Sequence, residues 1–245
     1  MTQGLYTIKE NYKTAKDVYK MILEGDTSAI TAPGQFINIK LDGLFLRRPI
    51  SICDWTEDTI TIIYKVVGEG TEKMASMTSG GVLDVLVGLG NGFDVAKSGD
   101  APLLIGGGVG TPPMYGLAKK LAEKGIKSLV VLGFASKDDV FYEEEFKALG
   151  CDVMTATVDG SYGIKGFVTD AIKQSGKEYS YFYTCGPLPM LKAVYDGTNT
   201  SGELSFEERM GCGFGACMGC SCKTKYGNKR ICKDGPVLVK EEIIW

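Results

Sequence analysis

Short runs of apolar and β-branched residues, separated by turns, fill the first hundred residues of the chain. Ile, Val and aromatic side chains dominate these runs, and Gly, Pro and Asp separate them. Six strands are expected, at residues 5–10, 17–25, 34–41, 48–55, 59–67 and 81–89. Strands of this length and spacing are typical of a small antiparallel β-barrel. The run "SGDAP", Ser98–Pro102, marks its end, so we expect a first domain over residues 1–98.

From Ala101 onward the pattern changes, because buried strands alternate with helical segments. Strands are expected at residues 102–108, 128–136, 151–159 and 179–187, and helices at residues 111–125, 138–150, 166–176 and 188–196. Alternation of this kind predicts a parallel sheet with helices on both faces. A polar run, "DGTNTSGE", then ends a second domain over residues 99–203.

Residues 204–245 form a cysteine-rich tail of about forty residues. Five of the eight cysteines of the chain fall between Met210 and Cys232. A segment this small cannot build a hydrophobic core of its own, so we expect a bound metal or cluster to organise a third, small domain.

Composition narrows the chemistry. The 27 Lys and Arg residues nearly balance the 30 Asp and Glu residues, which gives no reason to expect nucleic acid or an anionic membrane as a partner. No apolar run approaches a membrane span, and the N-terminus lacks a signal-peptide core, so a cytoplasmic location is expected. The chain has no histidine. This excludes Ser–His and Cys–His nucleophile pairs, mixed Cys/His zinc sites and Rieske ligation, and it indicates that bound cofactors supply the chemistry.

The spacing of the tail cysteines indicates an iron–sulfur cluster. Cys212, Cys217 and Cys220 follow the C-x4-C-x2-C spacing of plant-type [2Fe–2S] ligation, which also needs a distant fourth cysteine. Intervening glycines allow a loop to wrap closely round a cluster. The alternative is zinc, but only Cys217 and Cys220 form the C-x2-C knuckle that zinc sites usually repeat. Cys232 suits the fourth position better than Cys222, because a separate approach lets each iron receive two thiolates.

A glycine-rich turn predicts a nucleotide site. The segment Gly106–Met114, "GGGVGTPPM", follows an expected strand and precedes an expected helix, a context that supports a dinucleotide pyrophosphate on backbone N–H groups. It is not the Rossmann G-x-G-x-x-G, and Pro112 and Pro113 suit a helix start. A tight turn without a ligand is the alternative. The next expected strand ends in Lys137 beside Asp138 and Asp139 without an arginine, which favours NAD over NADP.

Two polar segments, "RRPIS" and "YKVVGEGT", interrupt the barrel strands. In "RRPIS", Arg48 would neutralise a pyrophosphate and Ser51 would hydrogen-bond a ring nitrogen of a flavin. A solvated arginine on a strand edge is the alternative reading.

These segments, followed by Cys185–Pro187 ("CGP"), resemble the ferredoxin–NADP reductase superfamily over about residues 1–195. The resemblance implies a β-barrel that binds FAD, a parallel-sheet domain that binds NAD, and a cysteine near the meeting point of nicotinamide and flavin. It implies FAD contacts at Arg48, Pro49, Ile50, Ser51, Tyr64, Lys65, Val66, Gly70 and Thr71. It implies NAD contacts at Gly106, Gly107, Gly108, Val109, Gly110, Thr111, Cys185, Gly186 and Pro187.

The tail extends the likeness to the whole chain. "SFEERMGCGFGAC" and "CKDGPVL", with "RRPIS" and "PGQF", resemble the iron–sulfur electron-transfer subunits of B-type dihydroorotate dehydrogenases. In that family the cluster ligands fall at the positions of Cys212, Cys217, Cys220 and Cys232, whereas Cys222 departs from the common pattern. The resemblance implies an FMN-containing catalytic subunit as partner, in a heterotetramer of two plus two chains.

Two other functions stay open from the sequence. One is the flavin and iron–sulfur small subunit of a cytoplasmic hydrogenase or of an NADH-dependent ferredoxin–NADP reductase, which shares both halves. The other is a zinc-knuckle interaction module without redox activity.

Overall fold

The computed structural model describes residues 1–245, and its N-terminal part is a closed barrel. Neighbouring strands follow the order β1-β2-β5-β4-β3-β6, and every pair is antiparallel. The strands are β1 (Thr2–Ala15), β2 (Val18–Glu24), β3 (Phe36–Lys40), β4 (Arg48–Trp55), β5 (Thr59–Lys65) and β6 (Val82–Leu89). The small antiparallel barrel predicted from the short apolar runs and their turns is confirmed, although β1 continues five residues beyond the end of its apolar run.

A short helix, α1 (Glu69–Ala75), follows β5, and the sequence pattern did not indicate it. Thr71 holds its first turn, because its hydroxyl oxygen accepts hydrogen bonds from the N–H groups of Val67 (2.9 Å) and Gly68 (3.3 Å). Met74 of this helix is fully buried in the barrel core, where it packs against strand residues such as Tyr64 and Met21. The helix therefore contributes to the core of the barrel.

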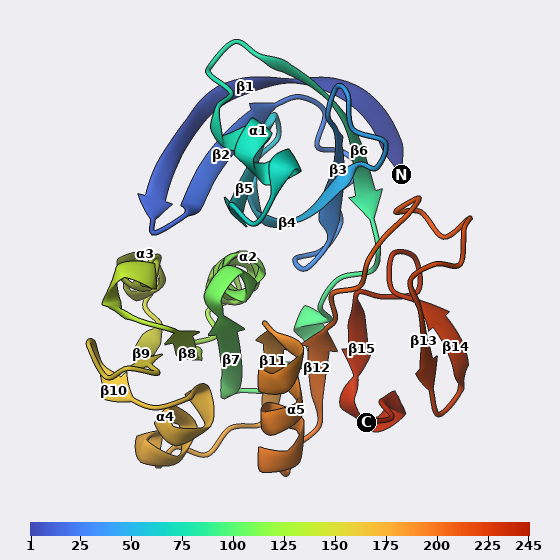
Figure 1. Cartoon of the computed structure of the whole chain (residues 1–245). Helices are drawn as coiled ribbons and strands as arrows, with labels where there is room; N and C mark the ends of the chain where they lie inside the picture. Colours follow the sequence, from blue (N-terminus) through green and yellow to red (C-terminus); the bar gives the residue numbers. More distant parts are fainter.

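The rest of the chain is built round a seven-stranded sheet of order β10-β9-β8-β7-β11-β12-β15 (Figure 1). All neighbours are parallel except the last pair, β12 with β15. The strands are β7 (Pro102–Gly107), β8 (Leu129–Phe134), β9 (Asp152–Thr157), β10 (Ile164–Lys165), β11 (Tyr181–Cys185), β12 (Gly202–Ser205) and β15 (Val237–Val239).

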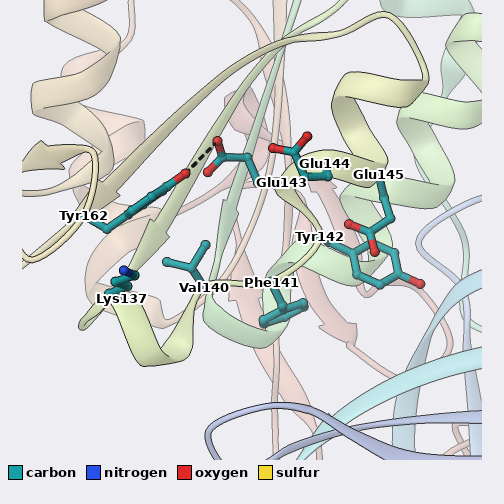
Figure 2. Close-up of a pocket in the computed structure, with 8 residues that line it drawn as sticks. All are labelled: Lys137, Val140, Phe141, Tyr142, Glu143, Glu144, Glu145 and Tyr162. Carbon is teal, nitrogen blue, oxygen red and sulfur yellow. Dashed lines mark hydrogen bonds between the residues drawn. The ribbon is translucent and has the colours of Figure 1, made fainter.

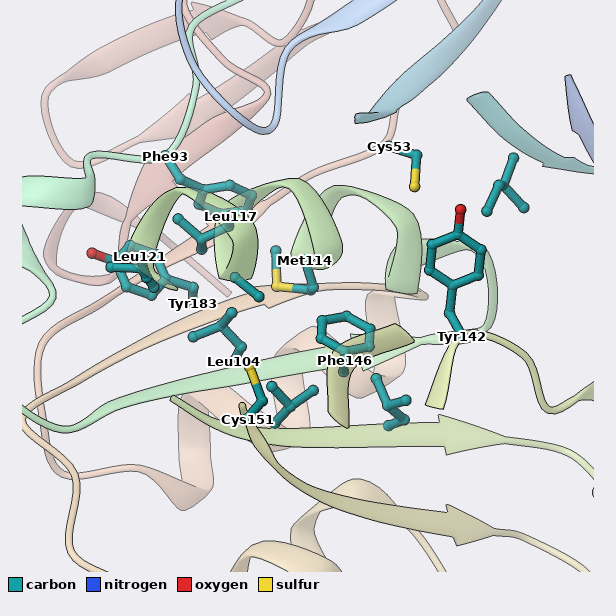
Figure 3. Close-up of a cluster of buried hydrophobic side chains, with 14 of the residues drawn as sticks. Cys53, Phe93, Leu104, Met114, Leu117, Leu121, Tyr142, Phe146, Cys151 and Tyr183 are labelled. Atoms are coloured by element: carbon teal, nitrogen blue, oxygen red, sulfur yellow. The ribbon is translucent and has the colours of Figure 1, made fainter. Parts of the chain in front are cut away.

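Helices cover both faces of this sheet, as the alternating pattern predicted. Figure 1 shows α2 (Thr111–Glu123) and α3 (Glu143–Ala148) on the face toward the barrel, and α4 (Val168–Ser175) and α5 (Leu188–Gly197) on the opposite face. Alternate strand residues face the two layers: Leu104 packs with α2, whereas Ile105 packs with α4 and α5. Figure 3 shows Met114 and Leu117 of α2 between Leu104 of the sheet and Cys53 of the barrel. One apolar cluster thus joins the barrel to the sheet through α2.

The helix expected over residues 138–150 is shorter in the structure. A 3-10 turn, η3 (Lys137–Asp139), comes first, and α3 begins only at Glu143. Tyr142 separates them with a φ of 67°, a left-handed conformation that few non-glycine residues adopt. Its ring packs edge-on against Tyr115 of α2, and it is almost fully buried. Burial of this aromatic ring breaks the helix that the local pattern favoured.

The cysteine-rich tail lies along the β12 edge of the sheet. β12 spans the position expected as the last domain boundary, and β15 returns to the same sheet, so the tail shares a core with the nucleotide domain. A hairpin, β13 (Ser221–Thr224) with β14 (Gly227–Arg230), projects beyond it (Figure 1). The remaining turns are η1 (Val95–Lys97), η2 (Gly108–Gly110) and η4 (Lys240–Glu242). No helix of the structure has the length and hydropathy that a membrane crossing requires.

Candidate functional site

A cavity of about 550 Å³ lies where the barrel meets the carboxyl ends of the sheet strands. Residues expected at the FAD and NAD sites line it together: Lys65 of the barrel, and Gly107, Gly108, Val109 and Pro187 of the second domain. Clefts at this edge of a parallel sheet are the usual ligand sites of such folds. The lining also includes apolar residues that the sequence did not identify, among them Phe134, Phe167 and Met190.

The glycine turn is shaped by close backbone approaches. A Cβ on Gly110 would lie 2.1 Å from the carbonyl oxygen of Cys185, and one on Gly107 would lie 2.4 Å from the Met190 sulfur. The turn forms η2, and α2 starts directly after it with Pro112 and Pro113 in its first turn, as expected. Glycine therefore lets this turn reach β11 and brings the predicted Gly106–Thr111 and Cys185–Pro187 segments together.

Cys185 lies at the carboxyl end of β11, opposite Gly106 of β7 and Ser205 of β12. Its packed surroundings raise the pKa of the thiol to about 12, while a contact with Ser205 acts in the opposite direction and the Glu207 carboxylate raises the pKa further. The group is therefore a neutral thiol near pH 7. Ser205 and Glu207 are site residues that the sequence reasoning missed, and only the pairing of β11 with β12 identifies them.

The two neighbouring arginines of "RRPIS" have different surroundings. Arg47 forms an ion pair with Asp84 of β6 at 2.9 Å. Arg48 forms no ion pair, its guanidinium lies against Gly70 of α1, and a Cβ on Gly70 would come within 2.0 Å of its Nε. A half-buried cation without a carboxylate partner suits the pyrophosphate of a dinucleotide. Arg48, Gly70 and Thr71, expected together at the FAD site, do lie together.

The other residues expected at the FAD site are more dispersed. Pro49, Ile50 and Ser51 follow Arg48 on β4 and are half-buried, and the Ser51 hydroxyl makes no hydrogen bond within the chain. Val66 donates its backbone N–H to the Asp17 carbonyl at 2.8 Å. Tyr64 lies in the barrel core and donates its hydroxyl to the Asn11 side chain at 2.9 Å. Its ring therefore supports the barrel from inside.

A second, smaller cavity of about 300 Å³ lies beside the first and shares Phe141 with it (Figure 2). Glu143, Glu144, Glu145 and Lys137 line it with Tyr162, whose hydroxyl donates to Glu143 at 3.2 Å. No arginine lines either cavity. Three carboxylates here oppose the binding of an additional phosphate.

The tail cysteines form two pairs. Cys217 donates its backbone N–H to the Cys212 sulfur, and Cys232 donates its backbone N–H to the Cys220 sulfur. Backbone N–H groups point at the sulfurs: those of Ala216 (3.2 Å) and Cys217 (3.5 Å) at Cys212, and that of Cys232 (3.4 Å) at Cys220. Nowhere in the chain do three or more thiols and carboxylates converge as they would round one metal ion. Two thiol pairs with N–H donors match the four sulfurs that a two-iron cluster needs.

Backbone geometry also affects the ionisation of these thiols. Burial acts to raise the pKa of Cys212, but N–H groups of Cys217, Phe214 and Ala216 outweigh it and lower the pKa to about 6. Burial and the neighbouring Cys220 raise the pKa of Cys232 to about 12. Cys212 is thus largely a thiolate near neutral pH, the form that binds iron.

Cys222 is separate from these pairs. It lies on β13 opposite Lys229 of β14 and packs against the edge of the sheet core. Burial raises the pKa of its thiol, and the Glu208 carboxylate adds to this effect.

Two family models match the chain. The model described as the iron-sulfur cluster binding domain of dihydroorotate dehydrogenase B matches residues 207–244. The model described as an oxidoreductase NAD-binding domain matches residues 104–196. These ranges contain the cysteine pairs and the glycine turn, respectively.

Relatives of known name match over the whole length. A Fusobacterium nucleatum subsp. nucleatum protein named dihydroorotate dehydrogenase B (NAD(+)), electron transfer subunit, is 47% identical, and the match covers 97% of this chain and 96% of that one. A Bacillus velezensis protein of the same name is 45% identical over 99% of both chains. Among solved structures, a chain of an NADH-dependent reduced ferredoxin-NADP oxidoreductase superimposes with a TM-score of 0.89 at 31% identity, covering 99% of this chain and 90% of that one.

Proposed function

The chain belongs to the family of dihydroorotate dehydrogenase B (NAD(+)) electron transfer subunits, and we propose from this premise how its residues perform electron transfer. In the proposal, electrons from a partner subunit that oxidises dihydroorotate to orotate pass through a [2Fe–2S] cluster and FAD to NAD+. The observation that carries the proposal is that one chain combines a nucleotide cavity at the sheet edge with a cysteine tail packed on the core of the same sheet.

The order of the cofactors follows from their chemistry. Flavin exchanges electrons singly with a cluster and in pairs with a nicotinamide, so FAD stands between the other two. In the chain, the barrel contacts both neighbouring sites: Phe36 and Leu86 pack against the tail, and Val18 and Lys65 line the cavity. A flavin held by the barrel would therefore have the tail and the cavity as its neighbours.

Residue roles in the proposal follow the site. Arg48 holds the pyrophosphate of FAD, with Gly70 and Thr71 shaping the adjacent turn, and the free hydroxyl of Ser51 bonds the flavin ring. The remaining proposed FAD contacts are Pro49, Ile50, Tyr64, Lys65 and Val66. Gly106–Thr111 and Cys185–Pro187 hold NAD. The carboxylates of the smaller cavity and the absence of a lining arginine support NAD over NADP.

Cys212, Cys217, Cys220 and Cys232 are the proposed cluster ligands. The two pairs would give each iron two thiolates, Cys212 with Cys217 and Cys220 with Cys232. The C-x4-C-x2-C spacing with a distant fourth cysteine supports a two-iron cluster over a zinc knuckle, in which C-x2-C pairs usually repeat.

The proposed partner is an FMN-containing catalytic subunit, in a heterotetramer of two plus two chains in the cytoplasm. The naming of the relatives as electron transfer subunits supports such a partner. A role within an NADH-dependent ferredoxin–NADP oxidoreductase is the second candidate, because one solved chain of that kind has nearly the same fold. The higher identity to the dihydroorotate dehydrogenase subunits, 47% against 31%, favours the first.

One assay tests the proposal. The purified chain, loaded with FAD and iron, is mixed with an FMN-containing catalytic subunit. Dihydroorotate and NAD+ are added, and NADH formation is followed by the absorption of the reduced nicotinamide. We expect NADH to form only when both chains are present. Absence of any gain over the catalytic subunit alone would rule out the pairing, and a chain that takes up zinc but neither iron nor flavin would support the knuckle.

A further inference from the structure

Asn38, on barrel strand β3, is buried in a position that a barrel strand normally exposes. Its neighbours Ile37 and Ile39 point into the barrel core, so Asn38 points outward by the alternation of a strand. Outward positions normally face water, yet Asn38 is 1% exposed. The tail covers it: Phe36 and Leu86, on the same outer wall, pack with Cys220, Ile231 and Cys232.

The amide of Asn38 contacts the first segment of the cluster loop. Its Nδ2 donates to the carbonyl oxygen of Cys212 at 3.4 Å, a long hydrogen bond. At the next residue, Gly213 has a φ of 80°, and a Cβ there would lie 2.2 Å from the same Nδ2. The loop therefore lies directly on the amide, and glycine at position 213 permits both the turn and the contact.

Apart from this nitrogen, Asn38 is held through its backbone and not through its side chain. Its backbone carbonyl accepts from Arg47 at 3.3 Å, and Arg47 also binds Asp84. The side-chain Oδ1 is buried without a hydrogen-bond partner, which is unfavourable in a folded protein. A leucine of similar volume would avoid that cost, so the amide is retained for what its nitrogen does.

We infer that Asn38 is a positioning residue for the iron–sulfur cluster: it fixes the backbone of Cys212 against the barrel wall and so sets the geometry of the first thiolate. The inference rests on the proposed ligand set. In the apolar wall the contact is stronger than it would be in water, and it connects the strand beside the "RRPIS" motif directly to the cluster loop.

The test compares Asn38→Leu with wild type and with Asn91→Ala. Asn91 also joins the barrel end to the tail, through hydrogen bonds with Val237 (2.8 and 3.0 Å), but it touches no proposed ligand. Each chain is reconstituted with iron and sulfide, and the iron content, the electron paramagnetic resonance spectrum of the reduced cluster and the rate of cluster loss to a chelator are measured. A second variant, Asn38→Asp, keeps the shape and removes the donor.

For Asn38→Leu and Asn38→Asp we expect a shifted resonance spectrum and cluster loss about fivefold faster, the scale of one lost buried hydrogen bond. Asn91→Ala should melt at a lower temperature with an unshifted spectrum. A wild-type spectrum and loss rate in both Asn38 variants, or equal changes in Asn91→Ala, would overturn the inference and leave the proposed function standing. A wild-type chain that binds no iron would overturn both. Variants that fold, by circular dichroism, but bind no iron while Asn91→Ala does would support it.

Discussion

At the scale of single residues, chemical environment distinguishes neighbours that the sequence presents as equivalent. Arg47 and Arg48 are adjacent and identical in type, but Asp84 neutralises only the first. Cys220 and Cys222 are two residues apart, but only Cys220 faces Cys232. Charge pairing and side-chain direction therefore determine which of each pair is available to a cofactor.

Replacing Arg48 by alanine should remove FAD. The lost charge-assisted contact weakens FAD binding about tenfold or more, because hydrogen bonds to charged groups exceed neutral ones in strength. The flavin absorbance that remains after gel filtration measures the effect. Arg47→Ala is the matched control: it should lower the melting temperature and retain FAD. Full FAD retention in Arg48→Ala would remove the assigned role.

Replacing each candidate fourth ligand by serine should separate Cys222 from Cys232. Cys232 is buried and faces Cys220, whereas Cys222 packs at the sheet edge. We expect Cys222→Ser to keep the cluster absorption and Cys232→Ser to lose it. The reverse outcome would reassign the ligand.

At the scale of elements, the contact of a turn with a neighbouring strand matters more for function than the turn alone. The turn η2 reaches β11 only because Gly110 lacks a Cβ, and β11 in turn aligns Cys185 with Ser205. The segment of α3 shows the opposite effect, since burial of Tyr142 overrides the local preference for helix.

Gly110→Ala should displace η2 from β11. Since the new methyl group would lie 2.1 Å from the Cys185 carbonyl, we expect a loss of about 1–3 kcal/mol in the free energy of unfolding and weaker NAD binding. Gly197→Ala, at the end of α5 where a Cβ meets only Thr169 at 4.0 Å, is the control and should leave both unchanged or improve stability slightly. Urea denaturation and NAD titration measure the two effects, and equal behaviour of the variants would contradict the packing argument.

Glu143, at the start of α3, should make stability depend on pH. Burial acts to raise the pKa of this carboxyl, but Lys147 and Thr155 outweigh it, so the pKa is below its ordinary 4.5. A carboxyl with a lowered pKa in the folded state contributes stability above 4.5, and this stability is lost as the pH falls through the folded pKa. Glu143→Gln should therefore cost about 1 kcal/mol at neutral pH, allowing for solvent screening, and progressively less in acid. Urea denaturation along a pH series checks this, and a constant difference at all pH values would contradict it.

At the scale of the whole molecule, the tail consists of two parts that are held in place by different interactions. Ile231, Leu238 and Ile243 belong to the core of the sheet domain, whereas residues 207–217 make no backbone–backbone hydrogen bond. The sequence indicated that a cluster must organise the entire tail. The structure limits that need to the loop that carries the first two cysteines.

Removing the iron should therefore loosen only part of the tail. After chelation we expect amide hydrogens of residues 207–219 to exchange rapidly, while those of residues 237–239, paired with β12, stay protected. Hydrogen exchange followed by mass spectrometry resolves the two segments, and the iron-loaded chain is the control. Exchange across residues 231–243 as fast as in the loop would show that the cluster, and not the shared core, holds the whole tail.

The sequence by itself determined the elements whose signals are local. Short apolar runs separated by turns predicted the barrel strands, the change of period predicted the parallel sheet, and the cysteine spacing with the glycine turn predicted the cofactor classes. Only the tertiary structure decided how distant segments meet. The return of β15 to the sheet, the pairing of Cys185 with Ser205, and the burial of Asn38 under the tail depend on residues far apart in the chain. Local sequence patterns show the periodicity of helices and strands and the residues that form turns. These contacts arise instead from packing between elements, which no local pattern records.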